Sequence, residues 1–180
     1  MKYLYVAAAP EVSAEDHRMV SDHVAGEFGL PVRRIGIPAV DFSYDSGRGG
    51  QYSSIAILEM LLRICPDDAE KLLAVTDRNL FVPVLTFVFG QAQLGGRLAV
   101  VSLARLRQEF YGLAPNREVF VERAAKEALH ETGHMFGLVH CADRNCAMSL
   151  ATNIRQIDTK LPAFCAPCRA HLTRTKGVKV

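Results

Sequence analysis

The segment His130-Glu131-Thr132-Gly133-His134-Met135-Phe136-Gly137-Leu138-Val139-His140 decides how the rest of the chain is interpreted. On a helix, His130 and His134 lie one turn apart on the same face, so both imidazoles can reach one zinc ion at about 2.0–2.1 Å. Glu131 points elsewhere and can reach a water on that metal, where a general base is needed. Gly137 allows the helix to end in a left-handed turn, after which His140 can supply a third nitrogen. Three histidines and one open position are typical of a catalytic zinc site.

The chemistry expected of this motif is hydrolysis of a peptide bond. Zinc would lower the pKa of its bound water from about 15.7 to roughly 7, and Glu131 would take the proton. The resulting hydroxide would attack a carbonyl polarised by the metal, and Glu131 would pass the proton to the leaving amine. The competing interpretation is a pair of exposed helical histidines beside an unrelated glutamate.

A second group of potential ligands follows the histidines directly. Cys141, Cys146, Cys165 and Cys168 have the spacing C-x4-C, a gap of 18 residues, and C-x2-C, which predicts a structural zinc held by four thiolates. The alternatives are buried free thiols or one or two disulfides. Cys65 stands outside the pattern and is expected to be a small buried hydrophobic side chain.

Composition and charge point to an ordinary globular protein. The chain has 180 residues, 49% of them hydrophobic, which fits one folded domain with its own core. The formal net charge of +2 gives no general field for nucleic acid or membranes. The apolar start 1–10 is too short for a signal peptide and favours a first buried strand. We therefore expect a cytoplasmic protein, in which the thiols are reduced and available as ligands.

Strand-like and helical segments alternate before the motif, which predicts an α/β fold with an α+β tendency. Strands are expected at Lys2–Ala8, Pro31–Ile37, Lys71–Val75, Val84–Phe89 and Arg97–Leu103. Helices are expected between Ser13 and Gly29, over Tyr52–Ile64 with Ile55, Leu58, Leu61 and Leu62 on the apolar face, and over Arg117–Phe136. The pair Gly95-Gly96 predicts a hairpin turn, so at least one edge strand is antiparallel.

The extended motif through Gly137-x-x-His140 resembles the metzincin clan of zinc peptidases. Within that clan, the four cysteines and Met148, two residues after Cys146, resemble the archaemetzincins. The resemblance implies a twisted mixed sheet with an antiparallel edge strand, a backing helix and an active-site helix, then a small irregular zinc-bound subdomain. It also implies a single metallopeptidase domain over 1–180, with an upper subdomain 1–137 and a lower subdomain 138–180.

The resemblance assigns roles to individual residues. His130, His134 and His140 would bind the catalytic zinc, with Glu131 as the acid/base. Met148 would lie under the metal as the Met-turn residue, which is also where ordinary apolar packing would put it. The cysteines would bind a second, structural zinc. The edge strand above the cleft, where an extended substrate could pair, would comprise Phe87, Val88, Phe89, Gly90 and Gln91. For that stretch the alternative is a plain sheet edge.

The expected partner is a peptide or an unfolded segment of protein, with no nucleic-acid or membrane partner, and the expected state is a monomer. Endopeptidase and aminopeptidase activity both stay open at this point. Two other classes compete with the enzyme. One is a non-catalytic zinc module that binds a partner or nucleic acid through the basic tail, with Arg169, Arg174, Lys176 and Lys179 as contacts. The other is an inert metzincin relative that folds without an active histidine site.

Overall fold

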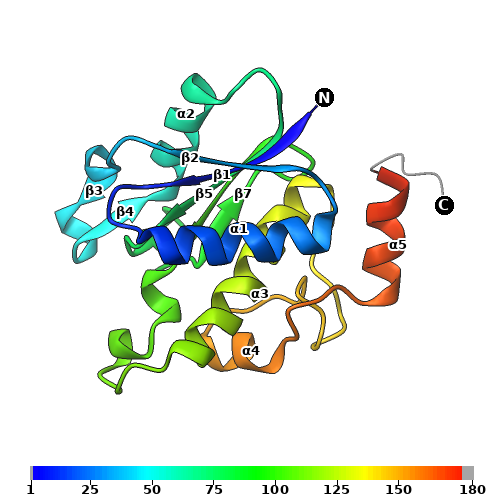
Figure 1. Cartoon of the computed structure of the whole chain (residues 1–180). Coiled ribbons are helices and arrows are strands. Elements are labelled where there is room, and N and C mark those ends of the chain that lie inside the picture. Colours follow the sequence, from blue (N-terminus) through cyan, green and yellow to red (C-terminus); the bar gives the residue numbers. More distant parts are fainter. Residues whose placement is uncertain (1, 176–180) are drawn as a thin grey trace.

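The structure, a computed structural model, describes residues 2–175. Its centre is a five-stranded sheet in the order β2-β1-β5-β8-β7 (Figure 1). The strands are β1 (Tyr3–Ala8), β2 (Val32–Gly36), β5 (Ala69–Thr76), β7 (Gly90–Ala92) and β8 (Leu98–Ser102). The first four neighbours in this order run parallel, whereas β7 is antiparallel to β8 and forms one edge. The expected mixed sheet with an antiparallel edge strand is therefore present.

Helices cover both faces of this sheet. They are α1 (Ala14–Phe28), α2 (Ser54–Ile64), α3 (Arg117–Met135), α4 (Ile154–Thr159) and α5 (Ala166–Thr175). One hydrophobic cluster joins α1 and α3 to one face of the sheet, and a second joins α2 to the other face. Figure 1 shows α4 next to α3 and α5 at the side of the molecule.

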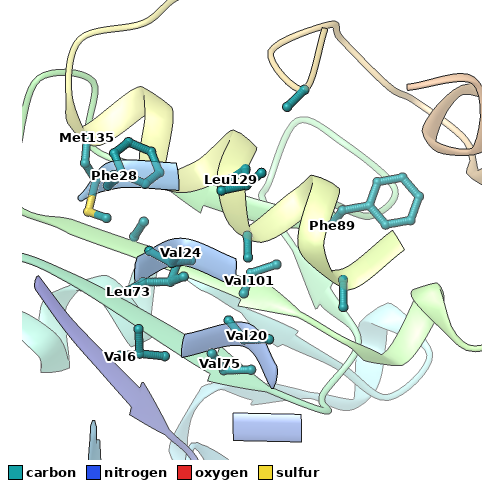
Figure 2. Close-up of a cluster of buried hydrophobic side chains, with 14 of the residues drawn as sticks. Val6, Val20, Val24, Phe28, Leu73, Val75, Phe89, Val101, Leu129 and Met135 are labelled. Atoms are coloured by element: carbon teal, nitrogen blue, oxygen red, sulfur yellow. The ribbon is translucent and has the colours of Figure 1, made fainter. Parts of the chain in front are cut away.

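The larger cluster is built from alternate strand residues and one stripe of each helix. Figure 2 shows Val6 and Leu73 of the sheet under Val24 of α1, with Leu129 of α3 in the same cluster. All four side chains are at most 1% exposed. Burying one such side chain contributes roughly 1.5–3 kcal/mol, so this layer holds α3 firmly against the sheet.

Local signals in the sequence account for the ends of these elements. The Ser13 hydroxyl accepts a hydrogen bond from the Asp16 N–H at 3.0 Å and caps α1, and Gly29 ends it with a φ of 59°. Asn116 caps α3 in the same way. The turn between β7 and β8 contains Gly95 at a φ of 67°, as the hairpin prediction required.

The expected strand at Val84–Phe89 is wrong. This segment is irregular apart from one bridge between Val88 and Leu80, and Val84 is 88% exposed. Pro83 lacks an N–H for pairing, and the Arg48 guanidinium binds the carbonyls of Pro83 and Leu85, which holds the segment as a loop. The strand begins later, at Gly90.

The apolar face of α2 also differs from the expectation. Ile57, Leu58 and Leu61 are buried, whereas Ile55 is 39% and Leu62 is 61% exposed. The helix starts at Ser54, and the residues that meet the sheet are those three on its inner stripe. Because apolar residues occur on several sides of α2, the sequence pattern does not determine which side of the helix faces the sheet.

Short elements complete the chain. A three-stranded sheet contains β3 (Tyr44–Asp45), β4 (Gln51–Ser53) and β6 (Leu80–Phe81) in the order β3-β4-β6. Single 3-10 turns lie at Asp41–Ser43, Ser46–Arg48, Ala104–Leu106 and Gln108–Tyr111. Within residues 2–175, no helix has both the length and the hydropathy that crossing a membrane requires.

Candidate metal centres and cleft

Three histidines converge at the end of α3. One ring nitrogen from each of His130, His134 and His140 lies within 4.8 Å of the others. The Nε2 atoms of His130 and His134 are 3.0 Å apart. Two nitrogens bound to one tetrahedral zinc would be separated by about 3.3 Å, so the spacing suits a shared ion.

Backbone carbonyls orient two of these rings. The Nδ1 of His130 lies 2.8 Å from the Ala147 oxygen, and the Nδ1 of His134 lies 2.7 Å from the Leu138 oxygen. Each Nδ1–H therefore donates to a carbonyl, which leaves both Nε2 lone pairs free to bind a metal. Burial lowers the pKa of all three histidines, and Lys160 adds to this effect. Neutral imidazoles are the form that ligates zinc, so the donor set fits this ion.

The end of α3 has the geometry that the motif predicted. Gly137 has a φ of 86°, in the left-handed region. Its N–H donates to the His134 carbonyl, and the Leu138 N–H donates to the Gly133 carbonyl, which are the two bonds of a Schellman motif. The chain thereby reverses within one turn and brings His140 back beside the helix.

A glycine inside the helix makes room for the methionine below it. A Cβ added to Gly133 would lie 2.5 Å from the Sδ of Met148 and 3.3 Å from Phe164. Met148 is fully buried against the helix that carries the histidines. This contact is ordinary packing beneath the helix, and the role of Met148 as a Met-turn residue stays a prediction.

Glu131 lies beneath the edge strand. The side chain is 5% exposed and lines the same cleft as the three histidines. A Cβ on Gly90 of β7 would be 2.6 Å from its Cγ and Oε1, so only glycine lets the strand pass over this carboxylate. Burial raises the pKa of Glu131 well above its ordinary value, the nearby Glu127 adds to the rise, and Lys160 opposes it. A carboxylate with a raised pKa is suited to exchange protons near neutral pH.

The cleft has a volume of about 500 Å³ and separates the edge strand from the residues that follow the helix. One wall contains all five residues expected in the edge strand, although only Gly90 and Gln91 are in β7. Phe87, Val88 and Phe89 lie outside β7, so the strand is shorter than expected. Val88 still forms a bridge with Leu80, and the Phe89 carbonyl accepts a hydrogen bond from the Ser102 N–H at 2.8 Å. The role of these residues as a substrate edge stays a prediction. Val139, Leu150 and Thr152 line the opposite wall.

The four predicted cysteines form a separate cluster. Their Sγ atoms lie within 4.8 Å of one another, and none is in a disulfide. The N–H groups of Met148 and Cys165 each approach the Cys146 Sγ at 3.4 Å. Such donors spread the charge of a thiolate, so the cluster suits a zinc ion. Cys65 is far from this group in the fold and is partly buried against the core beneath α2.

The sequence interpretation missed a charged pair behind the cleft. Glu127 Oε1 accepts a hydrogen bond from Lys160 Nζ at 2.9 Å, and both side chains are at most 4% exposed. The spacing of Glu127 and Glu131, four residues apart, places both carboxylates on one face of α3 and could have drawn attention to the first. Nothing in the sequence points to Lys160, which is 33 residues away.

The basic tail is only partly described. The guanidinium of Arg169 lies 2.6 Å from Glu27 Oε1 of α1, so this residue has a partner within the chain. Lys176 and Lys179 lie outside the described residues.

Comparison with known proteins gives consistent matches over most of the chain. Residues 28–174 match the family described as peptidase family M54. The archaemetzincin of Methanocaldococcus jannaschii is 43% identical over 147 residues, which cover 80% of this chain and 79% of that protein. The crystal structure of archaemetzincin from Methanopyrus kandleri superposes with a TM-score of 0.85 at 35% identity, covering 98% and 97% of the two chains. A structure described as a zinc-dependent peptidase from Methanocorpusculum labreanum gives a TM-score of 0.83 at 31% identity, covering 94% of this chain and 99% of that one.

Proposed function

Because the chain belongs to peptidase family M54 and is a metallopeptidase, we propose that it hydrolyses peptide bonds with Glu131 as the general base. The observation that carries this proposal is the convergence of three imidazoles beside one buried carboxylate in a single cleft. His130, His134 and His140 would hold the zinc that the family implies. The non-catalytic module is not favoured, because it leaves both Glu131 and Gly137 without a role.

The residues of the cleft would have distinct roles in the reaction. A bound zinc supplies Lewis acidity toward the substrate carbonyl and makes a water more acidic. Glu131, held under Gly90, would accept a proton from the attacking water on a carboxylate oxygen and return it to the leaving amine. The carbonyls of Ala147 and Leu138 would keep the His130 and His134 rings in one tautomer throughout.

Substrate would lie along the free edge of β7. The N–H and C=O groups on the outer side of this strand face away from β8 and can pair with an extended peptide. Gly90, Gln91 and the loop residues Phe87, Val88 and Phe89 would then contact it. An extended peptide could pair with this edge, which favours peptides and unfolded segments as substrates.

We also propose that the four cysteines hold a second, structural zinc, so that the chain binds two ions. This site would stabilise the segment 138–175, in which α4 and α5 are the only helices. The same proposal divides the single domain into an upper subdomain that ends at Gly137 and a lower subdomain that the cysteine-bound zinc would hold together. The direct check is metal analysis: two zinc ions per chain are expected, and replacing the three histidines by alanine should remove one of them.

Glu131→Gln tests the catalytic assignment. The variant keeps the shape of the side chain and removes its ability to take a proton, so peptide hydrolysis should fall by about 10²–10⁴-fold. Zinc content should stay at the wild-type level. Glu122→Gln is the matched control, because Glu122 lies on the same helix with its side chain 68% exposed and outside the cleft. Activity of Glu131→Gln within a few-fold of this control would contradict the mechanism.

A further inference from the structure

An ion pair lies against the wall of the cleft, one helical turn before the base. Glu127 is 3% exposed and lines the cleft together with Glu131. Its Oε1 accepts the hydrogen bond from Lys160, which directly follows α4. The pair therefore connects the helix that carries the histidines to the segment beyond the motif.

Stability alone does not account for this pair. Transferring two charges from water into a protein interior costs about as much as their attraction returns, and a well-packed hydrophobic pair often does as well or better. Lys160 is among the largest fully buried side chains in the described chain, so its ammonium is almost completely removed from water. A costly charge retained at the wall of a catalytic cleft points to a role in that cleft.

The two members of the pair differ in what they offer to a substrate. Lys160 is 1% exposed and lies behind Glu127, so its donors do not reach the cleft. Glu127 faces the cleft, and within residues 2–175 its Oε2 has no hydrogen-bond partner. The cleft therefore presents a carboxylate oxygen at this point, and no lysine or arginine is among the described residues that line it. Val139 and Leu150 provide apolar surface in the same cleft, which suits the methylene groups of a long side chain.

We propose that Glu127 is a specificity-determining residue, which selects a lysine or arginine side chain next to the scissile bond and disfavours an acidic one. Lys160 is a positioning residue in this proposal, because it holds Oε1 and so leaves Oε2 as the oxygen that would bind the substrate. A side chain that carries only donors can satisfy Oε2, whereas a substrate carboxylate would face both Glu127 and Glu131. The proposal rests on the peptidase function proposed above and identifies the substrates of that site.

The test compares cleavage of matched peptides by the zinc-loaded full chain. One fluorogenic scaffold is made with lysine, methionine or glutamate on each side of the scissile bond in turn, because lysine and methionine have similar length. A charge-assisted hydrogen bond should favour lysine over methionine by about 10- to 100-fold in kcat/KM at one of the two positions. Glutamate at that position should be cleaved more slowly than methionine.

Variants assign the preference to Glu127. Glu127→Met with Lys160→Met removes both charges together, so no buried charge is left unpaired, and the lysine-to-methionine ratio should fall to near one. Glu127→Gln, which retains an acceptor without the charge, should give an intermediate ratio. The control is Glu122→Gln, on the same helix with an exposed side chain outside the cleft, and it should keep the wild-type ratio.

The outcomes separate this proposal from the one it rests on. Equal cleavage of the lysine, methionine and glutamate peptides by the wild-type protein would overturn the specificity and leave the peptidase function intact. A preference for lysine that survives the double substitution would show that another residue causes it. If the wild-type protein cleaves none of the peptides, the peptidase function itself fails and the specificity falls with it.

Discussion

Gly133 lies in the last turn of α3, and replacing it with alanine gives a sharp test of the packing beneath the histidines. The added Cβ would lie 2.5 Å from the Met148 Sδ, and Met148 is fully buried and cannot move into solvent. Glycine to alanine inside a helix stabilises by about 1 kcal/mol through backbone propensity. Overpacking a tight core costs about 1–3 kcal/mol. Gly133→Ala should therefore lower the free energy of unfolding by up to about 2 kcal/mol.

Gly26 provides the matched control, because it is also inside a helix and an added Cβ would meet nothing within 4 Å. Gly26→Ala should raise the free energy of unfolding by about 1 kcal/mol. The propensity gain is common to both variants, so their difference isolates the overpacking cost of about 1–3 kcal/mol. The assay is urea unfolding of the zinc-loaded proteins followed by circular dichroism. Equal stability of the two variants would refute the close contact between Gly133 and Met148.

Three further predictions follow from the contacts described above. Gly90→Ala should displace Glu131 and reduce kcat/KM for peptides by about 100-fold, whereas Gly36→Ala, where an added Cβ meets nothing, should leave it unchanged. Burial alone would raise the pKa of Asp16, but hydrogen bonds from Arg107 and Arg117 hold that pKa below its ordinary value. The Asp16 carboxylate therefore stabilises the fold above about pH 4, and this stabilisation is lost as the pH falls through the lowered pKa. In Asp16→Asn, the free energy of unfolding should therefore fall less steeply as the pH is lowered below about 4. An unchanged pH dependence would contradict the stabilising role of the Asp16 carboxylate. Cys168→Ser should remove one zinc per chain in metal analysis and lower the thermal midpoint, and retention of both ions would count against the thiolate site.

The elements with local chemical signals were predictable from the sequence. Helix ends depend on hydrogen bonds or backbone geometry that involve only nearby residues, as at Ser13, Asn116 and Gly29. The motif on α3 was predictable for the same reason, because helical spacing alone places His130 and His134 on one face. His140 required the additional knowledge that Gly137 reverses the chain.

Features that depend on distant contacts were not predictable in this way. The loop before β7 has the apolar composition of a strand, and its true conformation depends on Arg48, which is separated from it by more than 30 residues. Lys160 follows a six-residue helix and has the appearance of a surface lysine. Its burial results from Glu127, a partner that no local periodicity reveals. The small sheet of β3, β4 and β6 likewise pairs segments too short to carry a pattern.

The segment Cys146-Ala147-Met148 contacts both groups of possible ligands. It supplies a sulfur to the cysteine group, the carbonyl that orients His130, and the thioether that fills the space under Gly133. Capture of an ion by either cluster would thus pre-order the other, and thermodynamic reciprocity requires the two affinities to rise by the same factor.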